Sequence, residues 1–360
     1  MNSIALGRQD VIVGVDTHKD EHVAVALDGL GGRLGERALP ANPDGYKRLM
    51  DWANALGAVH AYGVEGTGSY GNGLARFLRR HACHVVEVIR PPRKGERRLS
   101  GKSDSIDAEH AAREVLAGKA ATTPKLANGV VEAIRLVKIA RGSAVNARSQ
   151  AMITLKSVLV TAPDDLRHQL EPLTNYKLVN ACAALGLKGR LADPAVATNH
   201  VLASLAQRWL ELHKEVAAHS QVLKTLTHAA APQLVGAFGV GTDIAADLLV
   251  AAGDNTDRIR SEAAFAKLCG VCPIPAGSGK TNGRHRLNRG GNRHANAALY
   301  RAVVVRLRWH APTIAYMERR TAEGLSKREI IRCLKRYLVR EIYGLLPEPS
   351  GVAGGLASAA

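Results

Sequence analysis

Apolar runs of strand length alternate with helical patterns over residues 10–117, and this order restricts the fold more than any other feature of the chain. The continuous run Val11–Val15 is typical of a buried strand and ends at Asp16. The next run follows closely enough to pair with it antiparallel. We therefore expect strands at residues 11–15, 22–27, 33–39, 59–64 and 84–89, and helices from 42 or 44 to 56, from beyond 65 to 80, and from 103 or 104 to 116.

Three strands, a helix, a strand, a helix, a strand and a helix form the element order of a ribonuclease-H-like domain, so we predict an α/β, RuvC-like domain over residues 10–120. Asp16 ends the first strand, Glu65 ends the fourth, and Asp104 and Asp107 lie one helical turn apart. In such a domain these four carboxylates converge and repel one another. Mg²⁺ would offset the repulsion, since it takes hard oxygen ligands and leaves positions open for phosphate.

Each of these acids also has an ordinary explanation. Asp16 at the end of a strand can be a turn residue, and Glu65 can cap the helix that follows it. Asp104 and Asp107 can simply favour the N-terminus of their helix. Their joint placement, next to a basic loop, favours the metal site and makes all four acids candidate catalytic residues.

Strands disappear between about residues 126 and 232, where apolar residues recur at steps of three and four. Such positions form the seam of a coiled coil, within one chain or across two, although ordinary helical-bundle packing explains them equally well. The two stripes are Val130, Ala133, Val137, Ala140, Ala144, Ala147, Ala151, Thr154 and Val158, and Leu202, Leu205, Trp209, Leu212, Val216, Leu223 and Leu226. We predict a helical coiled-coil connector at 125–231, a mainly α domain at 232–346 and a disordered small-residue tail at 347–360.

Positive charge exceeds negative charge by 49 − 32 = 17, and most of the excess is local. Residues 280–340 hold 16 Lys and Arg against three acids, and residues 90–102 hold six against one. Acids at helical spacing do not balance these bases, which favours contacts with nucleic-acid phosphates. With the glycines of a turn described below, the candidate nucleic-acid-binding residues are Arg93, Lys94, Arg97, Arg98, Lys102, Gly239, Gly241, Lys280, Arg284, Arg286, Arg289, Asn292 and Arg293.

Hydrophobic residues make up 46% of the chain, without an apolar run near 18 residues, so we expect a folded protein that does not span a membrane. The N-terminus resembles no secretion signal, which favours a cytoplasmic location and five reduced cysteines. Cys269 and Cys272 are followed by His285 and His294, whose spacing is wider than zinc sites usually show. We expect two reduced cysteines there.

Ser278 lies between Gly277 and Gly279 with basic residues close behind it. A serine hydroxyl becomes a nucleophile when a base or metal removes its proton, and arginine forks can hold a phosphodiester for it. A flexible loop is the ordinary explanation. Gly239 and Gly241 similarly indicate either a helix-hairpin-helix turn, whose backbone N–H groups hold a phosphate, or a plain turn between helices.

These motifs together resemble the insertion-sequence one-ten family of DEDD transposases. The resemblance covers roughly residues 10–345. It is carried by the segments Val13–Lys19, Gly63–Tyr70, Lys102–Ala108, Cys272–Gly279 and Gly290–Tyr300.

The resemblance implies a RuvC-like domain in which Asp16, Glu65, Asp104 and Asp107 bind Mg²⁺, a coiled-coil connector, and a transposase domain with a catalytic serine. It implies that Ser278 forms a covalent phosphoserine with DNA. It also implies a structured guide RNA as partner and a homo-oligomer, dimer or tetramer. Gly277 stands where the family tends to carry a polar residue, which leaves open what orients Ser278.

Three other readings stay open. In the main alternative, the protein is a metal-dependent RuvC-like nuclease or junction resolvase, in which water attacks and Ser278 is passive. In another, the acids are degenerate and the protein only binds nucleic acid. In the third, Gly14–Thr17 is the first phosphate loop of an actin-like sugar kinase.

Overall fold

The computed structural model describes residues 7–88, 103–120, 122–186, 189–277, 279, 285–288 and 290–348. The chain divides into two compact units, residues 1–126 and 127–360. Each unit contains its own buried apolar clusters. Within the described residues no helix is both long and apolar enough to cross a membrane.

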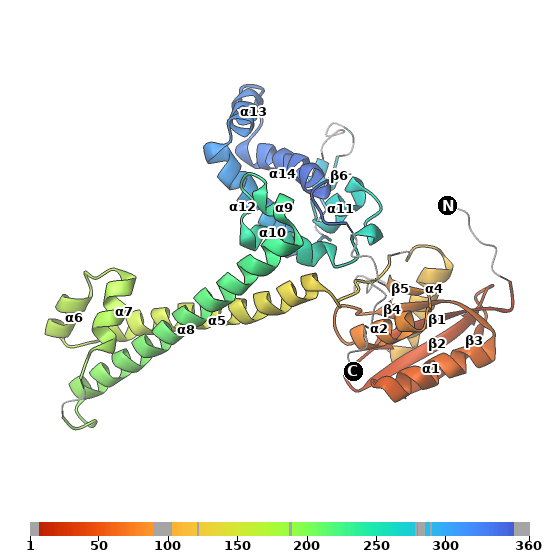
Figure 1. Cartoon of the computed structure of the whole chain (residues 1–360), viewed down its shortest axis with the longest axis horizontal. Helices are drawn as coiled ribbons and strands as arrows, with labels where there is room; N and C mark the ends of the chain where they lie inside the picture. The colour runs from red at the N-terminus through yellow and green to blue at the C-terminus, as the bar shows by residue number, and fades with distance from the viewer. Residues whose placement is uncertain are drawn as a thin grey trace, which may run out of the picture. The chain divides into compact units, whose positions relative to one another are not determined.

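A five-stranded sheet forms the centre of the first unit, with the strand order β3-β2-β1-β4-β5 (Figure 1). β1 (Asp10–Thr17), β2 (Glu21–Asp28) and β3 (Arg33–Pro40) are antiparallel neighbours. β4 (Ala58–Glu65) runs parallel to β1, and β5 (Val85–Val88) runs parallel to β4. The predicted order of elements in an α/β, ribonuclease-H-like domain is confirmed.

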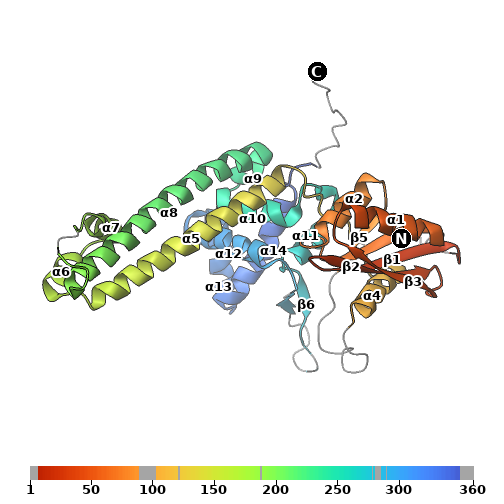
Figure 2. The ribbon, with the colours of Figure 1, turned by 90° about the horizontal axis from the view of Figure 1, so that it is seen from below.

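Helices cover both faces of this sheet, which explains why the β1 run is continuously apolar. One face packs against α1 (Pro43–Leu56) and α2 (Asn72–Arg80), whose Leu49 and Leu74 share a cluster with Val13. The other face packs against α4 (Asp104–Leu116), where Ala108 and Ala112 share a cluster with Ile12 (Figure 2).

Two glycines let α4 lie directly on the sheet. Gly14 of β1 and Gly63 of β4 are paired neighbours. A Cβ atom on Gly14 would overlap the carbonyl oxygen of Ala108 and the backbone nitrogen of Ala112. A Cβ atom on Gly63 would lie 3.0 Å from the carbonyl oxygen of Ala111. Small residues on both sides therefore bring the backbones of helix and sheet into contact.

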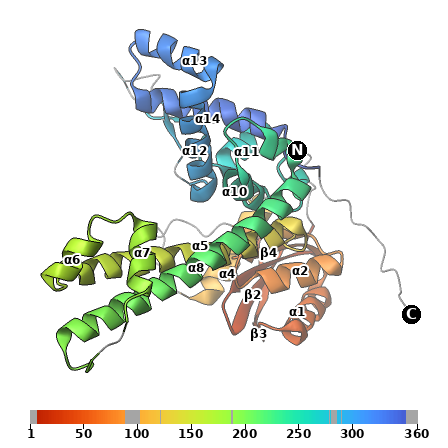
Figure 3. The ribbon, with the colours of Figure 1, turned by 60° about the vertical axis from the view of Figure 1, so that its left-hand side comes forward.

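The second unit begins with two long antiparallel helices, α5 (Val130–Val160) and α8 (Pro194–Ala230), which lie side by side (Figures 1 and 3). The Arg141 guanidinium donates to the Ser220 hydroxyl, and Arg148 contacts His213 at 3.0 Å, so the pair forms within one chain. The short helices α6 (Asp164–Leu170) and α7 (Asn175–Ala183) connect them.

The predicted stripe on α5 is displaced by one residue near both helix ends. Ala144 and Ala151 are buried as predicted, but Val130 is exposed, while Ile134 and Leu155 are buried in place of Ala133 and Thr154. Burial of Ile134 and Leu155 removes more apolar surface from water than burial of Ala133 and Thr154 would, so this register contributes more free energy at these positions. On α8, Leu202, Val216 and Leu223 of the predicted stripe are buried.

The rest of the second unit packs around the ends of α5 and α8 nearest residues 131 and 226. The Asp254 carboxylate caps α5 by accepting from the Val131 N–H at 2.8 Å. Asp247 joins three helices through ion pairs with Lys138 at 3.0 Å and Arg301 at 2.6 Å. The remaining helices are α9 (Pro232–Gly236), α10 (Thr242–Ala252), η1 (Thr256–Arg258), α11 (Glu262–Leu268), α12 (Arg293–Trp309), α13 (Ala311–Ala322) and α14 (Lys327–Tyr343).

A short hairpin occupies part of the segment that the sequence predicts as one loop over residues 273–293. β6 (Pro273–Pro275) pairs antiparallel with β7 (His285–Leu287). Two prolines lie in β6, and proline normally argues against a strand. At the edge of a two-stranded ribbon their missing N–H groups cost little, so the loop prediction was wrong for these six residues.

Replacement of Gly14 by alanine should separate α4 from the sheet. The new methyl group overlaps helix backbone, and overpacking of this kind costs about 1–3 kcal/mol or more. Denaturant unfolding followed by circular dichroism measures the loss. Gly142→Ala on α5, where a Cβ meets open space, is the control and should not destabilise the protein. Equal stability of Gly14→Ala and wild type would contradict the packing argument.

Candidate functional site

Asp16 and Glu65 lie at the ends of neighbouring parallel strands. They follow the paired residues Val15 and Val64, and only 1% and 3% of their surfaces are exposed. Since side chains alternate along a strand, Asp16 is on the same face as Gly14, and Glu65 is on the same face as Gly63. That is the face on which α4 packs. The Thr17 hydroxyl donates to the Glu65 carbonyl at 3.0 Å and ties the two strand ends together.

The N-terminus of α4 carries the other two acids. Ser103 has an extended backbone at the N-cap position, so the helix begins at Asp104. Asp104 and Asp107 both lie in its first turn, where the helix dipole favours negative charge. The side chain of Asp104 is about half exposed. The close packing of α4 on β1 therefore brings its first turn to the strand end that carries Asp16.

His18 lies between the two elements and was missed by sequence reasoning. Its Nε2 atom is 3.1 Å from an oxygen of Asp16 and 3.4 Å from an oxygen of Asp104. One ligand atom from each of these three residues lies within 4.8 Å of the other two. The available signal was its position two residues after Asp16, because the period of two along a strand predicts the same face if the extended backbone continues past Thr17.

Glu65 and Asp107 do not belong to the group of described residues whose ligand atoms all lie within 4.8 Å. Glu65 is buried on the strand next to Asp16, and Asp107 lies one helical turn beyond Asp104. Convergence of all four carboxylates on one metal centre stays a prediction.

The donor set of Asp16, His18 and Asp104 fits a divalent cation. Two carboxylates and one imidazole are ligands that Mn²⁺, Fe²⁺ and Zn²⁺ accept, and the carboxylates suit Mg²⁺. The buried Asp16 carboxylate provides a fixed ligand, while Asp104 faces solvent and leaves room for substrate or water. The arrangement can hold a cation at the edge of the sheet, within reach of a phosphate from solution.

Many of the predicted nucleic-acid-binding residues lie outside the described part of the chain. The predicted nucleic-acid-binding residues outside it are Arg93, Lys94, Arg97, Arg98, Lys102, Lys280, Arg284 and Arg289. Ser278, the candidate nucleophile, lies outside it as well.

Three of the predicted binding residues are described around the start of α12. Arg286 lies on β7, and Arg293 is the first residue of α12. Asn292 is the N-cap of α12, and its side chain accepts from the N–H groups of His294 and Ala295 at 2.9 and 3.1 Å. Asn292 therefore has a structural task in the helix, independent of any ligand.

The turn that contains Gly239 and Gly241 packs against α12. Gly239 has a positive φ of 77°, and a Cβ there would lie 3.1 Å from the carbonyl oxygen of Ala302. Gly241 precedes α10, whose first turn carries Asp243, and Arg141 pairs with that carboxylate at 2.9 Å. The backbone conformation of Gly239 and its close contact with α12 thus explain why glycine stands there. Phosphate binding by this turn stays a prediction.

Cys269 is fully buried, and burial raises the pKa of its thiol to about 12. A thiol with so high a pKa remains protonated at neutral pH, and a protonated thiol is a poor metal ligand. Both Cys269 and Cys272 are free cysteines.

Comparison with known proteins gives two family matches and two relatives. A model of DEDD transposases of the IS110 type matches residues 13–162, and a model of the IS116/IS110/IS902 transposase family matches residues 232–318. The 43.6 kDa protein of insertion element IS110 from Streptomyces coelicolor is 27% identical over 148 residues, which are 41% of this chain and 36% of the relative. The 42 kDa protein of insertion element IS900 from Mycobacterium paratuberculosis is 24% identical over 148 residues, 41% of this chain and 37% of the relative.

The chain thus matches little more than a third of the length of these curated relatives. The two family models, however, match successive parts of the chain in both compact units and describe the same kind of transposase. With the ribonuclease-H-like order of the sheet and the acidic cluster at its edge, they show that this chain belongs to the IS110 family of transposases.

Proposed function

We propose that this protein is the DNA transposase of an insertion element, which cuts and rejoins DNA strands with the help of a bound divalent cation. The observation that carries the proposal is the group formed by Asp16, His18 and Asp104, whose ligand atoms lie within 4.8 Å of one another at the edge of a ribonuclease-H-like sheet. Carboxylates so placed attract a cation, and a cation attracts the phosphodiester of DNA.

Mg²⁺ is the cation we assign to this site, with Asp16, Glu65, Asp104 and Asp107 as the proposed ligands; Asp16 and Asp104 belong to the group whose ligand atoms lie within 4.8 Å. A bound Mg²⁺ supplies positive charge that stabilises negative charge developing on a phosphodiester. The chain's own contribution is rigidity. Asp16 lies on a buried strand, and the packing of α4 on this strand holds Asp104 beside it.

Ser278 is the nucleophile in this proposal. Its hydroxyl loses a proton to a base, and its oxygen forms a bond to phosphorus while the bond from phosphorus to one deoxyribose oxygen breaks. The released strand takes up a proton at its hydroxyl. A hydroxyl of the incoming strand then attacks the phosphoserine, and the serine oxygen leaves. One phosphodiester bond is broken and one is formed, so rejoining requires no nucleotide cofactor.

DNA, a guide RNA and further copies of the chain are the proposed partners. The excess of 17 positive charges supports polyanionic partners of either kind. A structured RNA that pairs with donor and target DNA would assign the choice of sequence to base pairing. Assembly as a dimer or tetramer is proposed from the family resemblance.

Replacement of Ser278 by alanine should abolish strand joining and the covalent intermediate, because the attacking oxygen is gone. Mass spectrometry of protein trapped on element-end DNA measures the nucleotide adduct on Ser278. Ser204→Ala, at an exposed position of α8, is the control and should retain the adduct. If Ser278→Ala still cleaves DNA with water, the protein is a metal-dependent nuclease or junction resolvase instead.

Replacement of Asp16 by asparagine should remove the cation site while leaving the fold intact. A cation at one hundred times its dissociation constant stabilises a protein by about 2.7 kcal/mol, so Mn²⁺ should raise the melting temperature of the wild type. We expect no such rise in Asp16→Asn. Asp51→Asn, on the exposed side of α1, is the matched control. A rise in both variants would mean that the cation binds elsewhere.

His18→Ala should alter the selectivity among cations, since an imidazole nitrogen favours Mn²⁺ over Mg²⁺ relative to carboxylate oxygen. Titration calorimetry should show a larger loss of affinity for Mn²⁺ than for Mg²⁺. An equal loss for both ions would indicate that His18 only orients the two carboxylates.

A further inference from the structure

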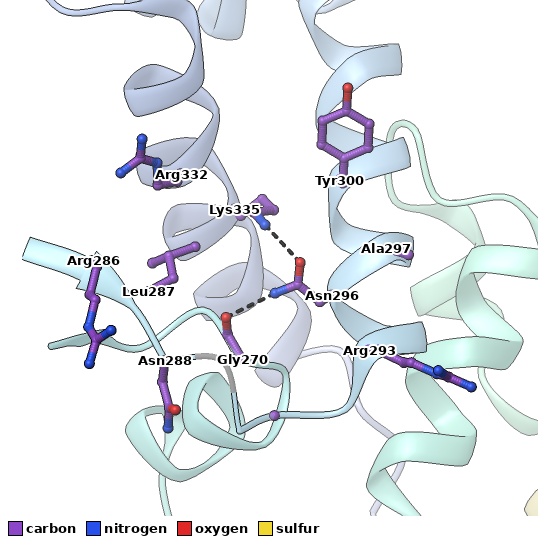
Figure 4. Close-up of a pocket in the computed structure, with 11 residues that line it drawn as sticks. Gly270, Arg286, Leu287, Asn288, Arg293, Asn296, Ala297, Tyr300, Arg332 and Lys335 are labelled. Carbon is purple, nitrogen blue, oxygen red and sulfur yellow. Dashed lines mark hydrogen bonds between the residues drawn. The ribbon is translucent and has the colours of Figure 1, made fainter.

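A basic cavity lies between α12, α14, β7 and the backbone around Gly270 and Gly291, within the second unit (Figure 4). Its volume is about 630 Å³. Arg286, Arg293, Arg332 and Lys335 line it, and none of its lining residues in the described part of the chain is acidic. Among these cations only Lys335 is buried, and together they make the cavity attractive to an anion.

Lys335 is the residue of the cavity with the strongest need for a partner. Only 8% of it is exposed, and its ammonium donates to the Asn296 side-chain oxygen at 2.9 Å. An ammonium has three N–H donors, and this neutral amide uses one of them. Burial lowers the pKa of Lys335, and the positive charge of Arg332 lowers it further. Bringing an anion to Lys335 would offset both effects.

Asn296 holds this ammonium in a fixed position. Its amide nitrogen donates to the carbonyl oxygens of Cys269 and Gly270 at 3.1 and 2.9 Å. The amide can therefore present only its oxygen to Lys335, as Figure 4 shows. Because Asn296 is itself held by two backbone carbonyls and holds Lys335, the Lys335 side chain loses little conformational entropy when a ligand binds.

Gly270 and Gly291, whose backbones are in contact, line the base of the cavity. A Cβ on Gly291 would overlap the backbone of Gly270, and Gly270 itself has a φ of 66°. The N–H of Asn292 donates to the carbonyl oxygen of Leu268 at 2.6 Å. Closely packed backbone therefore forms the base of the cavity, and arginine side chains contribute to its walls.

A second cavity of about 920 Å³, lined by several arginines and by one acid, Glu329, adjoins the first along α14. The two cavities share Arg286, Leu287 and Arg332. The second adds Arg336 and Arg340, both of which pair with Glu262. Within the described ranges neither Arg286 nor Arg332 pairs with a carboxylate, so the boundary between the cavities offers guanidinium groups to a ligand.

We propose that these adjoining cavities bind the backbone of a nucleic-acid strand, with one phosphodiester group seated between Lys335 and the guanidinium groups of Arg332 and Arg286. This inference rests on the proposed function and deepens it, since it assigns a phosphate-binding site to residues distant in sequence from the acidic cluster. A continuous pair of cavities suits a strand better than a mononucleotide.

Binding of fluorescent oligothymidylate and oligouridylate, followed by anisotropy over a range of salt concentrations, tests this inference. Lys335→Met should weaken binding about tenfold or more, as expected for a lost charge-assisted hydrogen bond. It should also reduce the salt dependence by about one phosphate contact. Comparing the two oligonucleotides shows whether DNA or RNA is preferred. Arg328→Gln, at an exposed position of the same helix outside both cavities, is the matched control.

Inorganic phosphate provides the second measurement, with sodium chloride at equal ionic strength as its reference. Phosphate should raise the melting temperature of the wild type and of Arg328→Gln, but not of Lys335→Met. Arg332→Gln, which removes a charge from the boundary of the cavities, should also weaken oligonucleotide binding and decides the question if Lys335→Met fails to fold.

Equal oligonucleotide affinity of Lys335→Met and Arg328→Gln would overturn the inference, even if Ser278 were shown to join strands. Conversely, Lys335-dependent binding without any adduct on Ser278 would leave the phosphate site standing and remove the proposed serine chemistry. The two proposals therefore fail in different experiments.

Discussion

The contact between α4 and the glycines of β1 and β4 is the constraint on which the candidate metal site depends. Without Cβ atoms at Gly14 and Gly63, the helix backbone rests on the sheet, and the first turn of α4 lies beside the end of β1. Asp104 is thereby brought to His18 and Asp16. Van der Waals packing between uncharged groups thus determines how closely charged groups approach, because a packed interior yields little to their repulsion.

The two compact units carry candidate sites of opposite charge. The N-terminal unit gathers carboxylates around His18, an arrangement that a divalent cation completes. In the C-terminal unit, arginines and the buried Lys335 line one cavity, where we propose that a phosphate binds. A nucleic acid with its cations carries both kinds of counter-charge, so each site separately fits the proposed function.

Sequence patterns predicted the regular parts of the protein well, because hydrophobic periodicity and local caps decide them. The strands, the helix that begins at Asp104, and the positions of Asp16 and Glu65 at strand ends all followed from such signals. The α5 stripe was misplaced near its ends because alanine and isoleucine counted equally as apolar residues. The β6–β7 hairpin was missed because prolines at a ribbon edge do not have the effect they have inside a sheet.

The sequence by itself determined the order of elements, the family and the kinds of charged groups present, since these depend on residue type and local spacing. Only the tertiary structure decided which groups meet. His18 contacts the acids because α4 lies close to β1. Lys335 of α14 contacts Asn296 of α12 because these two helices pack together, although α13 separates them in the sequence. Both contacts depend on the distance between backbones, which is set by packing across the whole unit and by no local pattern.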